Sequence, residues 1–294
     1  MANNLPREKQ LMVLRLLVEG NSLRAITRIT RIHRRAVVRT MMKVGERCEA
    51  FMTQHQRNIK AEHVEIDEQW SFVAKKQGHL TDTQKLDSTI GDQYLFVGLD
   101  QKTRMIITHT VGKRNDDTTR LFIAKLANRI VLPESPNAPV ELKPQLSTDG
   151  WACYPNAITD TFGSLAQHGV IIKNYQNEES GRYAAPDLSH CDRRRVQFVE
   201  NLMTICTSHV ERFNCTTRMF VKRFCRLTLA FSKKLANLDA AINLYIAYYN
   251  WCWRSRGKDG KGTCGRLRLT PAMQAGLTDR LWKLEDLYDA VMAC

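Results

Sequence analysis

The first fifty residues carry apolar positions at helical spacing in three consecutive segments. Gly20-Asn21 ends the first segment, Ser22 can cap the second, and a tight turn at 30–32 leads into a third from about His33. The apolar faces predicted for these helices are Leu11, Leu14, Leu17 and Val18; Leu23, Ile26 and Ile29; and Val37, Met41 and Val44. The pattern predicts a small all-α unit at the start of the chain.

A short helix, a three-residue turn and an arginine-rich helix form the layout of a helix-turn-helix, whose second helix enters the major groove of DNA. We expect four arginines to face DNA, where arginine pairs with guanine edges or clamps phosphate. They are Arg31, Arg34, Arg35 and Arg39. A three-helix bundle with a solvated basic face is the alternative. Residues 1–52 are predicted as this domain, and polar residues 53–62 as a linker or a continuation of the third helix.

Strand-like and helix-like segments follow one another after residue 63. The predicted order is strands over 64–73, 94–99 and 104–111, a helix over 117–130, a strand ending at Asp149, a helix over about 154–162 and a strand over 170–175. This is the order of a ribonuclease H-like α/β core, which places carboxylates at adjacent strand ends. We predict that core over 63–252, with an insertion at about 176–205, and a basic C-terminal extension over 253–294.

The charge is distributed unevenly along the chain. The net charge of +14 divides into +9 for residues 1–60, −3 for residues 61–200 and +8 for residues 201–294. A mildly acidic middle between two basic flanks suits a metal site with surfaces for a polyanion on either side. A basic protein without a polyanionic partner is the alternative.

The nine cysteines form no Cys-x-x-Cys pair, and no secretory signal begins at Met1, so we expect free thiols in the cytoplasm. Cys206-x-x-His209, with His190-Cys191 upstream, could hold zinc, but this is not a standard zinc spacing and no zinc is expected. The apolar stretch Ala240–Trp253 is too short to span a bilayer, so no membrane partner is expected.

Three short motifs carry acidic residues, and they are Ile66–Trp70, Ser147–Trp151 and His209–Asn214. The candidate metal ligands in them are Asp67, Asp149 and Glu211. Two carboxylates near 4 Å apart repel by about 4 kcal/mol at an effective dielectric of 20. Placing Asp67 beside Asp149 at strand ends is therefore unfavourable unless cations such as magnesium or manganese bind there. Each aspartate alone would more often cap a turn, but together they indicate a metal site. Strand alternation puts Glu65, Asp67 and Gln69 on one face, and Ile66 and Glu68 on the other.

A helix expected to start near Thr207-Ser208 combines an apolar face with a charged stripe. The apolar face is Val210, Phe213, Phe220, Val221 and Phe224, and the stripe is Glu211, Cys215, Arg218, Lys222 and Arg226. A carboxylate at the head of a basic stripe can bind metal while the cations behind it hold the DNA backbone; a solvated face is the alternative. At about 1.5 Å per residue, Lys222 would lie some 16 Å beyond Glu211 on that face.

These motifs resemble those of transposases of the insertion-sequence-one type, within the Asp-Asp-Glu superfamily of transposases and retroviral integrases. The matching blocks are Asp67-Glu68-x-Trp70-x-Phe72-Val73, Thr148-Asp149-Gly150-Trp151-x-x-Tyr154 and Val210-Glu211-Arg212-x-Asn214. Phe231–Leu235, Gly181–Tyr183 and Thr270–Asp279 are also similar, so the likeness covers nearly the whole chain. The chain departs from the family after Tyr249-Asn250, where a glycine-rich stretch, Gly257–Gly265, is inserted and no histidine follows.

The resemblance implies that Asp67, Asp149 and Glu211 bind two Mg²⁺, with Mn²⁺ tolerated, and that water or a DNA 3′-hydroxyl is the nucleophile. It implies cleavage and strand transfer on double-stranded DNA, namely the element's terminal inverted repeats and a target. At least a dimer on paired ends is expected, in the bacterial cytoplasm at the nucleoid. Further DNA contacts are expected from Arg212, Arg218, Lys222, Arg226, Lys233 and Lys234.

A DNA-binding regulator derived from a transposase, with the helix-turn-helix but without strand transfer, is the competing interpretation. A stand-alone nuclease of the same fold is a third. A chain free of metal chemistry need not keep three carboxylates in these motifs, which favours the transposase.

Overall fold

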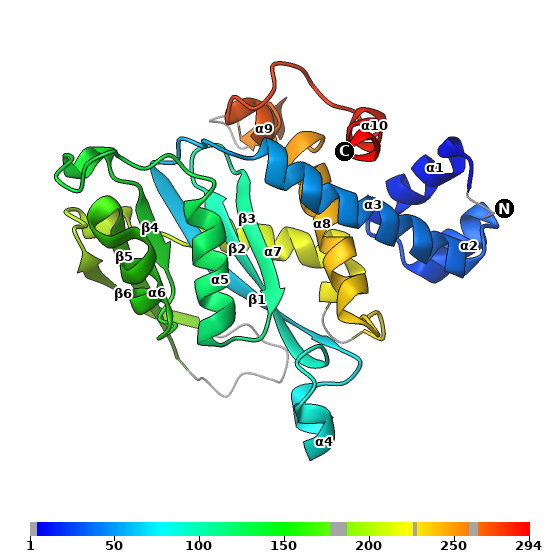
Figure 1. Cartoon of the computed structure of the whole chain (residues 1–294), viewed down its shortest axis with the longest axis horizontal. Helices are drawn as coiled ribbons and strands as arrows, with labels where there is room; N and C mark the ends of the chain where they lie inside the picture. Colours follow the sequence, from blue (N-terminus) through cyan, green and yellow to red (C-terminus); the bar gives the residue numbers. More distant parts are fainter. Residues whose placement is uncertain (1–4, 177–186, 226–227, 259–263) are drawn as a thin grey trace.

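A six-stranded mixed β-sheet forms the centre of the protein (Figure 1). The computed structural model describes residues 5–176, 187–225, 228–258 and 264–294. The strands are β1 (His63–Val73), β2 (Gly91–Asp100), β3 (Ile106–Gly112), β4 (Gln145–Thr148), β5 (Gln167–Gln176) and β6 (Asp187–Gln197), in the spatial order β3-β2-β1-β4-β5-β6. β4 runs parallel to β1 and β5, and the other neighbours are antiparallel. The predicted α/β class is confirmed, and the sheet is compatible with a ribonuclease H-like core.

The elements predicted for this core lie within a few residues of their observed positions, including helices α5 (Asp116–Ala127) and α6 (Tyr154–Phe162). Three elements of this region were not predicted, namely the short α4 (Asp82–Lys85), β6 and the helix α8 (Leu235–Trp251). β6 is an edge strand, and most of its described side chains are exposed or half-buried. Because such a strand needs no alternating apolar face, its polar sequence carries little strand signal.

Helices cover both faces of the sheet (Figure 1). β2 shows the division clearly, because Phe96 packs in the cluster that includes α5 and α6, whereas Leu95 and Val97 pack in the opposite one. The opposite layer contains α3 (Arg34–His55), α7 (Ser208–Phe220) and α8 (Leu235–Trp251). The centre of the sheet is therefore buried on both sides, while the ends of its strands remain available for a site.

The N-terminal part folds as α1 (Arg7–Val18), α2 (Leu23–Thr30) and the start of α3, as predicted. The Ser22 hydroxyl accepts a hydrogen bond from the Ala25 amide at 3.1 Å, and Arg31 ends α2 in a left-handed conformation. The prediction that Ile29 is buried was wrong, since it is 61% exposed. α2 is only eight residues long, and Ile26 is its buried residue in the small core with Val13 and Val37.

α3 belongs to both parts of the molecule, because it continues for 22 residues without interruption. Its start packs on α1 and α2, and its second half lies along α8 (Figure 1). Gly45 permits this close crossing, since a Cβ there would overlap the backbone carbonyl of Ala240. The predicted domain boundaries remain predictions, and the structure places residue 52 inside α3. The N-terminal helices are therefore held to the core by a shared helix.

The C-terminal segment folds back onto the N-terminal helices. It contains α9 (Pro271–Gln274) and α10 (Leu284–Ala293), and Leu287 and Val291 of α10 are buried. Asp289 pairs with Arg7 of α1 at 2.6 Å. A hairpin of β7 (Arg256–Lys258) and β8 (Cys264–Leu267) precedes them, so the inserted glycine-rich stretch lies partly outside the described residues. Within the described chain, no helix has the length and apolarity needed to cross a membrane.

Candidate active site

β1 and β4 bring Asp67 and Asp149 together where their pairing ends. The last parallel pair is Glu65 opposite Ser147, so each aspartate stands two residues beyond it. One carboxylate oxygen from each of Asp67, Glu68 and Asp149 lies within 4.8 Å of the others. The structure thus places two of the three predicted catalytic carboxylates side by side.

Glu68 is a further carboxylate at this place, and the sequence analysis gave it no role. Alternation was expected to separate Glu68 from Asp67. However, β4 ends at Thr148, so Asp149 lies beyond its strand and groups with side chains from both faces of β1. The Glu68 side chain is 2% exposed, and the buried Tyr154 hydroxyl lies beside its carboxylate. Its Oε1 has no hydrogen bond of normal geometry among the described residues. A buried, unpaired carboxylate oxygen next to two other carboxylates is a candidate cation ligand.

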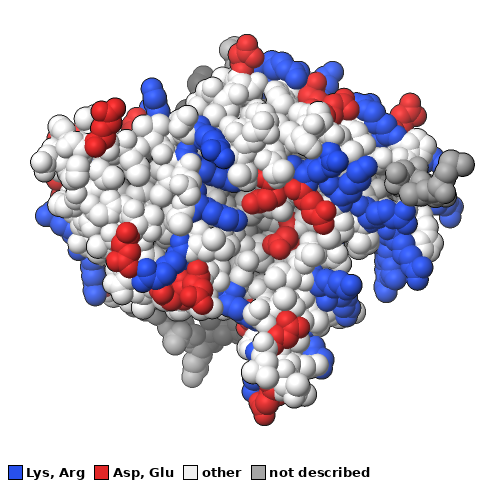
Figure 2. Space-filling view, in the orientation of Figure 1, with Lys and Arg blue, Asp and Glu red and all other residues white. Residues whose placement is uncertain are grey.

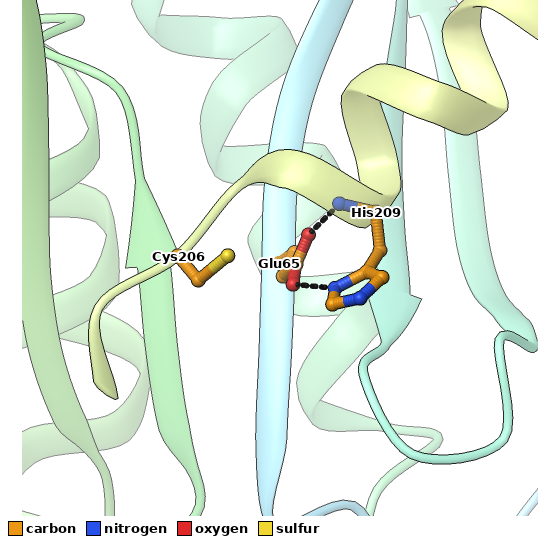
Figure 3. Close-up of side chains that lie close together, drawn as sticks. All are labelled: Glu65, Cys206 and His209. Atoms are coloured by element: carbon orange, nitrogen blue, oxygen red, sulfur yellow. Dashed lines mark hydrogen bonds and ion pairs between the residues drawn. The ribbon is translucent and has the colours of Figure 1, made fainter. Parts of the chain in front are cut away.

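Glu65 fixes the start of α7 against β1 (Figure 3). Its Oε2 accepts hydrogen bonds from the backbone amides of His209 at 2.7 Å and Val210 at 3.0 Å, and its Oε1 lies 2.6 Å from Nδ1 of His209. Amides of a first helical turn have no partner within the helix, so Glu65 caps α7. Cys206 lies close enough to complete a three-residue metal group. Both Glu65 oxygens already accept hydrogen bonds, which favours a structural role for the cluster.

We expect Glu65→Ala to lower the free energy of unfolding by about 2–4 kcal/mol, because two amides of α7 and the His209 imidazole lose a buried acceptor. Urea denaturation measures the change. Glu62→Ala is the matched control, since among the described residues the Glu62 side chain pairs with the exposed Lys102 alone, and its loss should cost less than about 1 kcal/mol. Equal, small effects of the two substitutions would contradict the capping role.

α7 is joined to β1 a second time beside Asp67. The Asn214 side-chain amide donates to Asp67 Oδ2 at 2.8 Å, and the Gln69 amide donates to the Asn214 carbonyl at 2.9 Å. Glu211 precedes Asn214 by three residues, so both face the same side of α7. Glu211 lines the same cleft, of about 570 Å³, as Asp67 and Asp149. The third predicted carboxylate therefore lies in the same site as the other two.

Glu211 is not part of the tight carboxylate group among the described residues. Its Oε1 accepts a hydrogen bond from the Thr207 hydroxyl at 2.7 Å and pairs with Lys173 of β5. A second cation, Arg114, contacts Glu68 at 3.3 Å and Asp149 at 3.2 Å. Lys173 and Arg114 were not predicted as site residues, because a single cation outside any motif carries no signal of what it contacts.

Burial and mutual repulsion make ionisation of the clustered carboxylates unfavourable. Burial, together with the neighbouring Asp149 carboxylate, raises the pKa of Asp67 to about 7. The same two causes, in the same order, raise the pKa of Glu68 to about 8. A bound divalent cation would relieve both costs, and its preferred ligands are carboxylate oxygens. The residues present therefore fit the metal site predicted from the sequence.

The predicted stripe behind Glu211 is only partly correct. α7 ends at Phe220, and Lys222 lies in a separate short 3-10 turn over Lys222–Phe224. The expected helical position of Lys222, three turns from Glu211, is therefore wrong. Val221 leaves the helical conformation at φ −114° and ψ 97°, and its side chain is buried instead in the main core. Arg218 does line the cleft, and Arg226 lies outside the described residues.

The remaining predicted DNA contacts belong to the N-terminal helices and to the core. Arginines of α2 and the start of α3 gather at one end of the molecule (Figure 2). The four predicted arginines, Arg31, Arg34, Arg35 and Arg39, are exposed there beside Arg24 and Arg28, which were not predicted. None of the six forms an ion pair with another part of the chain that the structure describes. Arg212, Lys233 and Lys234 are exposed on the core. Lys222 and Lys233 line a second cleft, whose other wall includes Arg24 and Arg34.

Comparison with known proteins relates the chain to an insertion element. It is 24% identical to the insertion element iso-IS1n protein InsB of Shigella dysenteriae over 182 residues, which cover 62% of this chain and 92% of that protein. No protein-family model matches the chain. The predicted relationship to insertion-element proteins is supported at this level of similarity.

Proposed function

We propose that the chain is a metal-dependent DNA strand transferase of an insertion element, which cleaves the ends of its own element and joins them to target DNA. The observation that carries the proposal is the pairing of Asp67 with Asp149 beyond the last β1–β4 pair, with Glu211 in the same cleft. The similarity to an insertion-element protein supports the same class.

In this proposal, Asp67, Asp149 and Glu211 would hold two Mg²⁺, or Mn²⁺ in their place. The bound metals would supply activation of the attacking hydroxyl and charge stabilisation for an in-line displacement. The protein's part is to hold these ligands. Asn214 holds Asp67, and the Trp151 amide donates to Asp149 Oδ1 at 2.9 Å. Thr207 holds Glu211 at the start of α7. Each ligand is thus oriented by a second residue before a metal binds, which limits the reorganisation that binding requires.

DNA recognition is proposed for exposed basic residues of the N-terminal helices and of the core. The N-terminal helices would act as a helix-turn-helix that binds the terminal inverted repeats, with Arg31, Arg34, Arg35 and Arg39 at the DNA. Arg218 would hold the backbone near the reacting bond, and Arg212, Lys233 and Lys234 would hold it on the core. Lys222 would act from the second cleft rather than from the α7 stripe. At least a dimer on paired ends, at the bacterial nucleoid, completes the proposal.

The test is a strand-transfer assay with double-stranded oligonucleotides copied from the DNA on either side of the gene. We expect Mg²⁺-dependent nicking at the element end and covalent joining to a plasmid target, with neither product from a scrambled end. Specific binding of the end without cleavage in Mg²⁺ or Mn²⁺ would instead assign the chain to the transposase-derived regulators. Cleavage without joining would indicate a nuclease.

A further inference from the structure

Arg114 occupies an unusual position for a cation in a metal site. Its Nη2 atom lies 3.3 Å from Glu68 Oε2 and 3.2 Å from Asp149 Oδ2, so one nitrogen bridges two carboxylates of the cluster. A divalent cation that used these oxygens would occupy the same space. The guanidinium and the metal therefore compete for common ligands.

The guanidinium is held in place by an aromatic side chain as well as by the carboxylates. Its carbon lies 4.2 Å from the centre of the Trp151 ring, and the indole nitrogen donates to the Thr119 hydroxyl of α5 at 3.2 Å. Arginine stacks favourably on an indole face, so this contact can persist when the ion pairs break. The Arg114 side chain is 33% exposed in the cleft, and its buried Nε has no partner among the described atoms.

Two cations, Lys173 and Arg114, compensate half of the negative charge that the four carboxylates of the cleft would carry when ionised. Lys173 pairs with Glu211, and Arg114 pairs with Glu68 and Asp149. Asp67 forms no ion pair within the described chain and accepts a hydrogen bond from the neutral amide of Asn214. Four carboxylates can therefore fold together without a metal. The cations that make this possible must give up their partners when a metal binds.

We propose that Arg114 is a resident counter-cation that a divalent metal displaces from Glu68 and Asp149, and that the released guanidinium, still stacked on Trp151, then pairs with a DNA phosphate. The inference rests on the proposed metal site. Displacement of Arg114 would make metal binding and phosphate binding cooperative, because the metal frees the guanidinium that the phosphate then binds.

The first experiment measures Mn²⁺ binding to the full-length, DNA-free protein by calorimetry. Because the metal binds only the fraction of molecules whose carboxylates are free, Arg114→Gln should bind Mn²⁺ about threefold to tenfold more tightly than the wild type. Arg120→Gln is a matched control, since Arg120 also bridges two carboxylates, Asp116 and Asp160, but on the surface. It should leave the affinity unchanged. Asp149→Asn should lose most of the binding.

Arg218→Gln tests whether loss of any positive charge from the cleft tightens Mn²⁺ binding. Arg218 lines the cleft but pairs with no carboxylate among the described residues, so it does not compete with the metal for ligands. Its removal should tighten Mn²⁺ binding much less than removal of Arg114. Equal tightening by both variants, or weaker binding by Arg114→Gln, would overturn the inference. Should Arg114→Gln fail to fold, Arg114→Lys keeps the charge but holds the two carboxylates less well, and it should still bind Mn²⁺ more tightly than the wild type.

The second experiment measures the salt dependence of DNA binding in Ca²⁺ and in EDTA. If Arg114 reaches a phosphate only after release, Arg114→Gln should reduce the slope of log K against log [salt] by about 0.9 in Ca²⁺ and by almost nothing in EDTA. Equal slopes of wild type and variant in Ca²⁺, or equal reductions in both buffers, would overturn the release step. Absence of Mn²⁺ binding by the wild type would overturn the proposed function itself. Equal Mn²⁺ affinities of the wild type and Arg114→Gln would overturn this inference alone.

Discussion

Asp67→Asn, Asp149→Asn and Glu211→Gln are each expected to reduce strand cleavage and strand transfer by more than about a hundredfold, because loss of a charged metal ligand removes several kcal/mol of stabilisation. Binding of the DNA end should change little, since it depends on arginine and lysine elsewhere. Gel-based cleavage and strand-transfer assays, with end binding measured in parallel, give both results from one preparation.

Asp160→Asn is the matched control for these three variants. Asp160 is a carboxylate of α6 that pairs with Arg120 on the surface, away from the cleft, and its loss should leave all activities unchanged. More than about a hundredth of wild-type activity in any of the three variants would remove that residue from the catalytic set. Loss of end binding in all three would point instead to a folding defect.

The spatial pairing of Asp67 with Asp149 follows from patterns that a sequence carries. Alternation identifies the strand around Asp67, and the short strand before Asp149 is bounded by a proline-rich segment and a glycine. The prediction that Glu65, Asp67 and Gln69 share a face is confirmed, since all three contact α7. Side chains alternate between the two faces of any strand, so this prediction does not depend on which elements pack around β1.

The partners of these carboxylates could not be predicted in the same way. Glu68 joins the cluster only because β4 ends at Thr148, and Lys173 and Arg114 reach it from β5 and from the loop before α5. Such contacts depend on where a neighbouring strand stops, which periodicity locates only to within a few residues. The same uncertainty misplaced Lys222, because the apolar pattern continues past Phe220 although the helix does not.

The raised pKa values predict how stability depends on pH when no metal is present. The pKa of Asp67 is about 7 in the folded protein, against an ordinary value of 3.8, so between these values the folded state holds a proton that the unfolded state releases. Stability therefore falls as pH rises through this window, by up to roughly 4 kcal/mol for this one group. Glu68, with a pKa of about 8, acts in the same direction.

In EDTA, Asp67→Asn should therefore be more stable than the wild type at pH 8, and the difference should shrink towards zero near pH 4. The difference between the two proteins is the informative quantity, because the lowered pKa values of buried His109 and His168 act in the opposite direction below about pH 6.5 in both. Urea denaturation at several pH values gives the free energies of unfolding.

Mg²⁺ should reverse the order of the two proteins at high pH. A metal binds the ionised carboxylates, so it stabilises the wild type increasingly as pH rises, and it should stabilise Asp67→Asn much less. Asp160→Asn should follow the wild type in both buffers, since its carboxylate lies outside the cluster. If wild type and Asp67→Asn differ by the same amount at pH 5 and pH 8 in EDTA, Asp67 does not carry a raised pKa. Burial of Asp67 beside Asp149 would then not lower the stability of the metal-free protein at high pH.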